Sequence, residues 1–539
     1  MVDLVLCRYT WDSSAEKSQM LARRLARRGL GTTAAAAAAA GSGQYDVLIN
    51  GGGIVGAVFA VSLLRQVGKS SGLRIGIVDP RPPPSLESCL ARATPDVRVY
   101  AMSPRSIETL EAVGAWKHVV ARSQPYDSMQ VWESTGPGLL RFSAPGADES
   151  AATPPYLGCI VEDSTVQAAV YRALEEENGA GAVDFLFGQS VTGLQVQRDA
   201  ELGSAHHLAL VTLSSTGGAA VAAAAAATTT TQVRARLVVG ADGAASAVRR
   251  LSGGSTWGWS YGQEALVATV RVAAPHRTAW QRYLPAGLPL ALLPLWGDLS
   301  SIVWSLPVAE ARRLSALPPQ EFLVALNEAL QAPPRTDRWS VLEPGDAPYP
   351  RAIREIASLA DAVMSAAAAS ATGAASFQSP PAITEIVSAR VGFPLQLQQA
   401  GCYTSPRVAL VGDAAHSIHP QAGQGLNLGI ADARVLASTV AGALEAGGDI
   451  GDPVLLQREY GAPQYAANLA MMGAVDGLGR VFALGGGGGG GGWRGGRLPR
   501  VLQMLRGAGM LAINALGPVK SRIAARAMGV DSGSGVGKR

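Results

Sequence analysis

The segment YDVLINGGGIVGA at Tyr45–Ala57 decides the fold class of this 539-residue chain. A short β-rich run is followed by an apolar helical run that continues to Leu64, and between the two stand Gly51, Gly53 and Gly56. In such a turn the first glycine permits a tight bend, the second lets a pyrophosphate approach the backbone, and the third lets the helix pack on the strand. The free N–H groups at the start of the helix attract phosphate. The segment therefore predicts an α/β dinucleotide-binding fold, although the glycine spacing alone would be a weak signal.

A second predicted strand, Arg74–Val78, ends in Asp79, which stands 23 residues after Gly56. An acidic residue at about that distance can accept hydrogen bonds from a ribose hydroxyl, and it suits an adenosine ribose that carries no phosphate. Because strand, glycine turn, helix and acidic residue occur in the expected order, a purely structural turn is the less favoured interpretation.

A later segment, RVALVGDAAHSIHPQAGQGLNLGIADA at Arg407–Ala433, indicates that the nucleotide is a flavin. A buried-strand pattern ends before Gly412 and Asp413, where open α/β sheets bind their ligands, and the Asp could hold a ribityl hydroxyl. Gly423, Gln424 and Gly425 then precede a helix-like run at Leu426–Leu436. Uncovered N–H groups at that point could face the O2/N1 edge of an isoalloxazine ring as this edge gains negative charge.

The same segment permits a metal site, because His416 and His419 are three residues apart and could share a helix face. Pro420 interrupts the helix that they would need, and no cluster of Cys or carboxylate residues supplies further ligands. We therefore predict no metal site.

A third motif lies between these two, in ARLVVGADGAASAVRR at residues 235–250. Asp242 follows a predicted strand that ends near Gly240, and it precedes a short helix. It could cap that helix or orient groups on the flavin pyrophosphate, and a plain Asp-Gly turn is the alternative. The residues by themselves leave these possibilities open.

Length and composition set the broad class. A chain of 539 residues predicts two domains with appendages, because a single core rarely grows beyond about 250–300 residues. The net charge is only +4, and no basic patch interleaved with aromatic residues occurs, so nucleic acid is not an expected partner. The four cysteines are scattered without a Cys-x-x-Cys pair, so neither a disulfide framework nor a metal site is implied, and a reducing compartment is compatible with this pattern.

Basic residues concentrate at the two ends of the chain. Lys17–Gly43 carries four arginines and no acidic residue, which is typical of an organellar transit peptide, with a plain disordered tail as the alternative. From Gly477 to Val530 there is again no acidic residue. This region could lie on anionic lipid as a basic amphipathic tail, or it could pack on the protein as a helical hairpin. No apolar run reaches the roughly 18 residues that span a bilayer, so we expect a soluble or peripheral protein.

Several segments resemble the aromatic flavin monooxygenases typified by para-hydroxybenzoate hydroxylase, and within that group the ubiquinone-biosynthesis hydroxylases. The resemblance covers about Tyr45 to Gly529 apart from inserts. The segments that carry it are DVRVYAMSPRSIETLEAVGAW (Asp96–Trp116), GWSYGQEALVATV (Gly258–Val270), AWQRYLPAGLPLALLPL (Ala279–Leu295), GDAAHSIHPQAGQGLNLGIAD (Gly412–Asp432) and LRGAGMLAINALGPVKSRIAARAMG (Leu505–Gly529).

The resemblance implies FAD as the cofactor and gives the candidate residues their roles. Gly51, Gly53, Gly56 and Asp79 would hold the adenosine diphosphate half, and Asp242 would belong to the Asp-Gly motif of the family. Arg98 would reach the flavin from the loop before a helix that starts at Ser103-Pro104, and a surface salt bridge is its alternative role. Gly412 and Asp413 would bind the ribityl chain. The isoalloxazine ring would be lined by Pro420, Gly423, Gln424 and Gly425. The family usually has Glu where this chain has Asp79, which shortens the reach and keeps the acceptor.

The resemblance also implies the reaction, the partners and the location. Reduced FAD would bind O2 as a C4a-hydroperoxide, and the ring of a polyprenylated phenol would attack it and become hydroxylated at ring carbon 5. The reductant would be ferredoxin, with its ferredoxin reductase, or NADPH. The protein would be mitochondrial, peripheral on the matrix side of the inner membrane, and possible partners include a multi-subunit ubiquinone-biosynthesis complex. No catalytic base can be named from the sequence, and His419 is only a weak candidate.

The predicted fold is an α/β FAD-binding domain of the Rossmann type, with an inserted antiparallel or mixed β-sheet substrate domain and a C-terminal helical segment. Trp257 to Trp304 holds five of the ten tryptophans, and its apolar side chains could roof the flavin or merely fill a core. Low-complexity tracts at Ser214–Thr231, Met364–Ala382 and Gly485–Gly492 are predicted as inserted loops. The predicted boundaries are 1–44 for the transit peptide, 45–255 and 403–483 for the FAD-binding domain, 256–402 for the substrate domain, and 484–539 for a glycine linker with basic helices.

Two other classes of function stay open at this point. The chain could be a non-catalytic FAD-binding scaffold of a membrane-associated biosynthetic complex. It could also be an FAD-dependent reductase or oxidase of isoprenoids. Fold alone does not separate these classes, because one fold hosts many functions.

Overall fold

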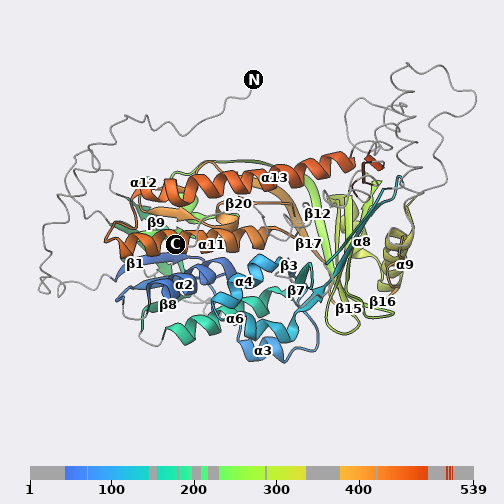
Figure 1. The fold of residues 1–539 in the computed structure, drawn as a ribbon, viewed down its shortest axis with the longest axis horizontal. Coiled ribbons are helices and arrows are strands. Elements are labelled where there is room, and N and C mark those ends of the chain that lie inside the picture. Colours follow the sequence, from blue (N-terminus) through green and yellow to red (C-terminus); the bar gives the residue numbers. More distant parts are fainter. Residues whose placement is uncertain are drawn as a thin grey trace, which may run out of the picture.

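The computed structural model describes residues 43–68, 71–136, 138–144, 155–178, 181–196, 208–215, 230–285, 288–334, 377–419, 423–483 and, near the end, 506, 507, 509, 510 and 513. The predicted transit peptide and glycine linker, most of the three low-complexity tracts and most of the basic C-terminal region lie outside these residues. Figure 1 shows an elongated molecule, with one sheet and most of the helices on the left and a large second sheet on the right.

The first half is built on an eight-stranded sheet with a parallel centre (Figure 1). Its main path runs β18 (Thr404–Ser405), β19 (Val408–Leu410), β11 (Thr230–Gly240), β1 (Gln44–Asn50), β2 (Ile75–Asp79) and β8 (Val183–Phe187), and β10 (Ala209–Ser215) links β11 to β9 (Gln189–Gln195). The contacts of β1 with β2 and β11, and of β11 with β19, are parallel. The predicted Rossmann-like domain is confirmed.

Helices cover this sheet with apolar faces that the sequence encodes. Helix α2 (Ile54–Val67) is buried from Ile54 to Leu64 with little interruption, because it packs on the sheet and on both α6 (Asp163–Glu177) and α11 (Gly425–Glu445). Smaller helices complete this half: α3 (Leu86–Leu90), α4 (Pro104–Ala112), α5 (Trp116–Val119), α7 (Ala247–Leu251) and α12 (Pro453–Leu456). As predicted, Ser103 caps α4, accepting from the Ser106 N–H at 3.3 Å, and Pro104 is its first residue.

The second half contains a nine-stranded mixed sheet. Its order is β20 (His416–Ser417), β17 (Val391–Ala400), β12 (Thr256–Val272), β15 (Leu299–Pro307), β14 (Leu288–Pro294), β13 (Thr278–Leu284), β5 (Ser128–Glu133) and β6 (Leu139–Ser143), with β16 (Ile383–Ile386) beside β12. The predicted inserted sheet is confirmed. Strands β5 and β6 join it although they precede residue 256, and β13 pairs in parallel with β5.

One face of this sheet packs on helices α8 (Val308–Ala316) and α9 (Pro319–Gln331), seen at the right of Figure 1. Trp280 and Trp304 lie in that core beside Phe322, so these two tryptophans fill a core and do not roof a cofactor. Trp257 and Trp259 lie on the surface, at 41% and 40% exposure. Of the two roles proposed for the tryptophans, the structure favours the packing role.

A small third sheet and a long helix connect the halves. Strand β7 (Gly158–Glu162) lies between β3 (Val99–Met102) and β4 (Gln124–Tyr126). Helix α13 (Ala462–Ala483) follows a π-helical turn at Gln457–Gly461 and runs along the upper side of the molecule in Figure 1, from α12 toward the nine-stranded sheet. In the part of the chain that the structure describes, no helix combines the length and apolarity needed to span a bilayer.

Candidate functional site

The three motifs singled out in the sequence leave the first sheet at the same edge. Asn50 at the end of β1 is in register with Gly240 of β11, and Gly240 is in register with Leu410 of β19. The strands are parallel, so the turns that follow them emerge side by side at the carboxyl edge. Segments that follow Asn50 and Leu410, which are 360 residues apart, are thus brought to one place.

The three glycines of the first turn differ in backbone conformation and surroundings. Gly51 has a φ of +111°, and a Cβ added there would lie 2.3 Å from the Ala241 oxygen. A Cβ on Gly56 would lie 2.2 Å from the Gly51 oxygen, so only glycine lets α2 approach the turn so closely. A Cβ on Gly53 would meet no atom within 4 Å. Gly53 therefore borders open space, as a backbone that receives a pyrophosphate must.

Side chains from two other elements hold this turn. The Asp79 carboxylate accepts from the Gly52 N–H at 2.8 Å and, with its other oxygen, from the Arg81 N–H at 2.9 Å. Tyr171 and Gln167 of α6 donate to the Gly52 oxygen at 3.0 and 2.9 Å. Asp79 thus fixes the turn as well as standing at the end of β2, where a ribose would lie.

Asp242 acts as a cap in the structure. Its carboxylate accepts from the Ser246 hydroxyl at 2.5 Å and from the backbone N–H groups of Ala247 and Val248 at the start of α7. The Asn50 side chain donates to it at 2.7 Å. Of the roles left open by the sequence, helix capping is present, and it ties the Asp-Gly turn to the end of β1.

The early and late glycine motifs are in contact through Val55, the second residue of α2. Gly412, with a φ of +58°, would place a Cβ 3.3 Å from Val55, and Gly429 of α11 would place one 2.7 Å from it. Gly429 needs glycine because Val55 fills the space, and Gly412 needs it mainly because of its positive φ, with Val55 in close contact. The phosphate-binding turn and the segment predicted to hold the flavin therefore form one continuous surface.

A buried carboxylate, Asp432, holds the late segment at Gly412 and His416. Asp432 of α11, which is fully buried, accepts from the Gly412 N–H at 3.0 Å and from His416 Nε2 at 2.6 Å. Its other oxygen accepts from Gln464 and Asn468 of α13, each at 3.0 Å. Desolvation alone would lower the pKa of the His416 imidazole, but Asp432 and Asp413 raise it above its usual value. Asp432 lies within the quoted segment, yet nothing in its spacing predicted this role.

Asp413 and Arg98 lie near each other, as the predicted site requires. Asp413 is exposed, yet surrounding protein desolvates its carboxylate and raises its pKa, against the influence of His416 and Arg98. Desolvation lowers the pKa of Arg98, but Tyr100, Asp163 and Asp413 raise it by more, so the guanidinium stays charged. A carboxylate that is open to solvent but crowded by protein is available to a ligand that displaces the remaining water.

The start of α11 is tied to the Arg98 segment by Asn427, a residue that the sequence did not single out. Its side chain accepts from the Ser103 N–H at 2.9 Å and donates to the oxygens of Ala101 and Gly423, both at 2.9 Å. Gly423 has a φ of +60°, and α11 begins at Gly425, one residue before the predicted helical run. Gln424 precedes it as the N-cap, without a side-chain cap bond. Pro420 lies outside the described residues.

The second sheet approaches the site with its other face. Ala265, Val267 and Val303 pack there with Val97, next to Arg98. The ring of Tyr261 meets the ring of His419 edge-on at 4.9 Å. Burial lowers the pKa of His419 to about 4, so this imidazole is neutral at physiological pH and too weak a base to deprotonate a phenol there.

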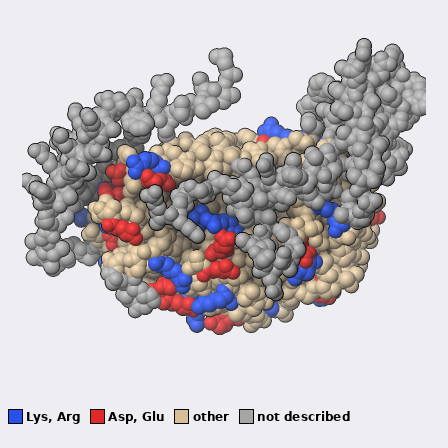
Figure 2. All heavy atoms as spheres, in the orientation of Figure 1, with Lys and Arg blue, Asp and Glu red and all other residues tan. Residues whose placement is uncertain are grey.

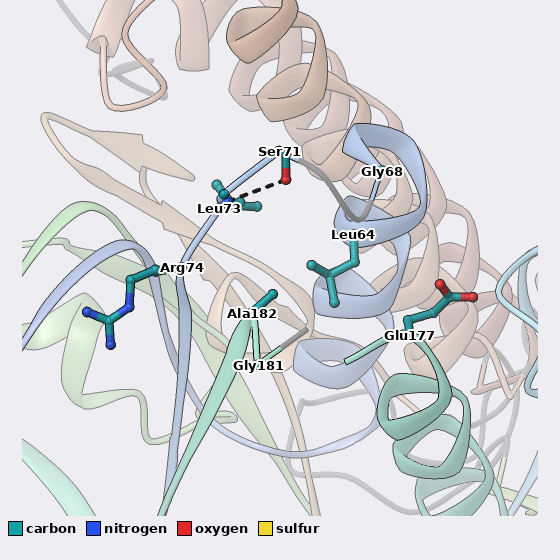
Figure 3. Close-up of a pocket in the computed structure, with 9 residues that line it drawn as sticks. Leu64, Gly68, Ser71, Leu73, Arg74, Glu177, Gly181 and Ala182 are labelled. Atoms are coloured by element: carbon teal, nitrogen blue, oxygen red, sulfur yellow. Dashed lines mark hydrogen bonds between the residues drawn. The ribbon is translucent and has the colours of Figure 1, made fainter. Parts of the chain in front are cut away.

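The pocket shown in Figure 3 is separate from this site. It is lined by Leu64 and Gly68 at the end of α2, by Leu73 and Arg74 before β2, and by Ala182 before β8. These residues precede the parallel strands, whereas the site lies where the strands end. The pocket is therefore at the opposite edge of the sheet.

Comparisons with known proteins agree with this geometry. Residues 44–332 and 363–453 match the family described as FAD binding domain. The mitochondrial ubiquinone biosynthesis monooxygenase COQ6 of Mus musculus is 32% identical over 530 residues, covering 97% of this chain and 97% of that protein. The protein of the same name from Homo sapiens is 31% identical and covers 89% of this chain and 92% of its own.

Solved structures show the same fold. The p-nitrophenol 4-monooxygenase PnpA of Pseudomonas putida superposes with a TM-score of 0.59 at 15% identity, covering 92% of this chain and 100% of that one. PqsL of P. aeruginosa in complex with 2-aminobenzoylacetate gives a TM-score of 0.55 at 24% identity, covering 87% of this chain and 100% of that one. At such low identities the likeness extends to the fold alone.

Proposed function

We propose, from the premise that this chain belongs to the FAD-binding family of the mitochondrial ubiquinone biosynthesis monooxygenases, that it hydroxylates a polyprenylated phenol at ring carbon 5. The chain is an FAD-dependent monooxygenase of the ubiquinone pathway. The observation that carries the assignment of the site is the contact of Val55 with Gly412 and Gly429, which joins the phosphate-binding turn to the late glycine segment.

The residues present fit FAD, and we propose a role for each. Gly51, Gly53 and Gly56 would form the turn that receives the pyrophosphate. The space beside Gly53 is free of protein atoms, whereas Gly51 and Gly56 are packed against the backbone. Asp79 would accept from the adenosine ribose, and Asp242 would keep the adjoining turn in place. Gly412 and Asp413 would bind the ribityl chain. Arg98, Pro420, Gly423, Gln424 and Gly425 would surround the isoalloxazine ring.

Bound FAD, once reduced, supplies the activation of O2. The chain contributes placement and a dry surface: the Ala265, Val267 and Val303 side chains face the Arg98 segment and would exclude water from an aromatic ring held between them. The N–H groups at the start of α11 would stabilise negative charge on the flavin. His419 has too low a pKa to serve as the base at physiological pH.

We propose ferredoxin, reduced by a ferredoxin reductase, as the electron donor, and a peripheral position on the matrix side of the mitochondrial inner membrane within a multi-subunit biosynthetic complex. The mitochondrial relatives support the compartment. Stopped-flow mixing tests the donor: reduced ferredoxin should bleach the flavin absorbance rapidly and NADPH alone should not. Rapid bleaching by NADPH alone would refute the ferredoxin proposal.

One experiment tests the reaction. The purified holoprotein is reduced under anaerobic conditions and then mixed with O2 and candidate quinone precursors. The masses of the products are measured by mass spectrometry. Hydroxylation adds the mass of one oxygen atom, and fragmentation locates it on the ring. A yellow protein that yields no product would indicate a scaffold, and a product that gains only hydrogen would indicate an isoprenoid reductase.

A further inference from the structure

Helix α13 presents a long apolar face to solvent. Every exposed position of this helix carries Ala, Gly, Pro, Leu or Val, apart from position 480, which carries Arg. The largest exposed side chains are Leu469, Leu478 and Val481, at 39%, 47% and 43% exposure. An exposed apolar surface of this length on a helix of 22 residues marks a contact surface.

The charges at the edge of this face are neutralised within it. Arg480 donates to Asp476 at 2.7 Å, and its guanidinium lies 5.4 Å from the centre of the Trp259 ring. Asp476 also accepts from the Tyr261 hydroxyl at 3.0 Å. Both charged side chains of α13 therefore already have partners, so neither would be left unpaired if the helix entered an apolar medium.

Two exposed tryptophans on β12 extend the face sideways. The rings of Trp257 and Trp259 are 6.4 Å apart, and the Trp257 indole N–H donates to the Tyr465 hydroxyl of α13 at 3.4 Å. Tryptophan favours the boundary between water and lipid, since its ring is apolar and its N–H is polar. In Figure 2 the upper edge of the molecule, along which Figure 1 places α13, is mostly uncharged between the grey segments.

The chain that follows α13 supplies the complementary charge. From Gly477 to Val530 the sequence contains no Asp or Glu, and its basic residues are Arg480, Arg494, Arg497, Arg500, Arg506, Lys520, Arg522 and Arg526. Two of these residues are described and already paired, Arg480 with Asp476 and Arg506 with buried Glu133. The others provide an excess of positive charge that anionic headgroups would attract.

We propose that α13 and the start of β12 form a docking face for the surface of an anionic lipid bilayer. The apolar side chains Leu469, Leu478 and Val481 enter the boundary between headgroups and acyl chains, and Trp257 and Trp259 lie at the level of that boundary. This rests on the proposed function, in which the substrate carries a polyprenyl chain and resides in a membrane.

Lipid fits this face better than a protein partner does. Protein interfaces combine an apolar centre with a polar rim that forms about one hydrogen bond per 100–200 Å². Along α13 the exposed positions offer almost no side-chain hydrogen-bonding group. The inner side of the helix is anchored by Asn468, which donates to buried Asp432, so the outer face is held in place before any contact is made.

The test uses the full-length holoprotein and vesicles of phosphatidylcholine with or without cardiolipin. Co-sedimentation should be strong with the anionic vesicles and fall when salt screens the headgroups. The double variant Leu469→Glu/Leu478→Glu should bind about tenfold less or weaker, because two carboxylates would have to enter the lipid boundary. The matched control is Val324→Glu on α9, which changes a 58% exposed valine away from the face and should bind like wild type.

A second measurement needs no change of α13. Acyl chains that carry bromine should quench the tryptophan fluorescence of wild type, and Trp257→Phe/Trp259→Phe should lose that quenching. Unchanged binding by the double Glu variant, or quenching that survives the removal of both tryptophans, would overturn the docking face. Hydroxylation of a short-chain, water-soluble phenol without vesicles reports on the proposed function separately.

Discussion

At the scale of single residues, Asp413 gives the clearest indication that the site binds a ligand. Its carboxylate is desolvated by surrounding protein, which raises its pKa, and no donor among the residues that the structure describes forms a hydrogen bond with it. A desolvated carboxylate destabilises the folded state at neutral pH unless a donor reaches it. The hydroxyls of a ribityl chain are such donors.

We therefore expect Asp413→Ala to lose FAD without losing the fold. A hydrogen bond to a charged group contributes about 1.5–3 kcal/mol, so the Kd for FAD should rise roughly 10- to 150-fold and the protein should be purified colourless. The melting temperature of the apoprotein should not fall. Glu385→Ala, on β16, is the control and should retain the yellow colour. Retention of FAD by Asp413→Ala would refute the placement of the ribityl chain.

Substitutions at the glycines of the first turn should distinguish effects on FAD binding from effects on protein stability. Gly53→Ala meets no atom within 4 Å, so the apoprotein should melt at the wild-type temperature while FAD affinity is lost. Gly56→Ala places its Cβ 2.2 Å from a backbone oxygen and should lower stability by about 1–3 kcal/mol as well. Titration with FAD and thermal melts distinguish the two effects. Gly442→Ala on α11, which also meets no atom, should change neither property for the worse. If Gly53→Ala binds FAD normally, the pyrophosphate does not lie there.

At the scale of elements, the late glycine segment is held by the helices beneath it. Asp432 accepts hydrogen bonds from the segment, through Gly412 and His416, and from α13, through Gln464 and Asn468. Helix α13 therefore has a structural inner face as well as an apolar outer one. Any displacement of α13 would act directly on the loop that is predicted to hold the flavin.

We expect Asp432→Asn to destabilise the protein by about 3–5 kcal/mol, because an amide would turn N–H donors toward groups that already donate and would leave His416 without its charge partner. Urea unfolding of the apoprotein measures the loss. Asp298→Asn removes an exposed ion pair with Arg271 and should lower the stability far less, because solvent screens that pair. Equal stabilities for the two variants would show that the buried network is not what holds the segment.

At the scale of the whole molecule, buried histidines predict the dependence of stability on pH. Burial lowers the pKa of His419 to about 4 from its ordinary value near 6.5. The folded state then binds fewer protons than the unfolded chain between these values. The contribution is fully present above about pH 6.5 and is lost as the pH falls through about 4. His416 has the opposite sign, since its raised pKa adds stability that is lost as the pH rises.

The test compares wild type with His419→Gln by urea unfolding at several pH values. Between about pH 7 and pH 4.5 the wild type should lose roughly 2 kcal/mol more than the variant, which has no group to titrate at this position. Parallel curves for the two proteins would mean that the imidazole is not desolvated in the folded state.

Features that depend on neighbouring residues could be predicted from the sequence, and features that depend on distant residues could not. The strand at β1, the glycine turn and the start of α4 were predicted because they depend on neighbouring residues: the turn on φ and Cβ space, the helix on its cap. The roles of Asn427 and Asp432 were not, although both lie in quoted segments, because their partners are up to 326 residues away. The addition of β5 and β6 to the second sheet was missed for the same reason.

The sequence alone determined a strand, glycine turn and helix of the dinucleotide-binding type and a late glycine segment suited to a flavin, because backbone conformation and the absence of side chains are local properties. Only the tertiary structure decided that the two segments meet at Val55, that Asp242 caps a helix, and which tryptophans are buried or exposed. Those facts depend on the register of parallel strands and on packing between distant elements, which no local pattern encodes.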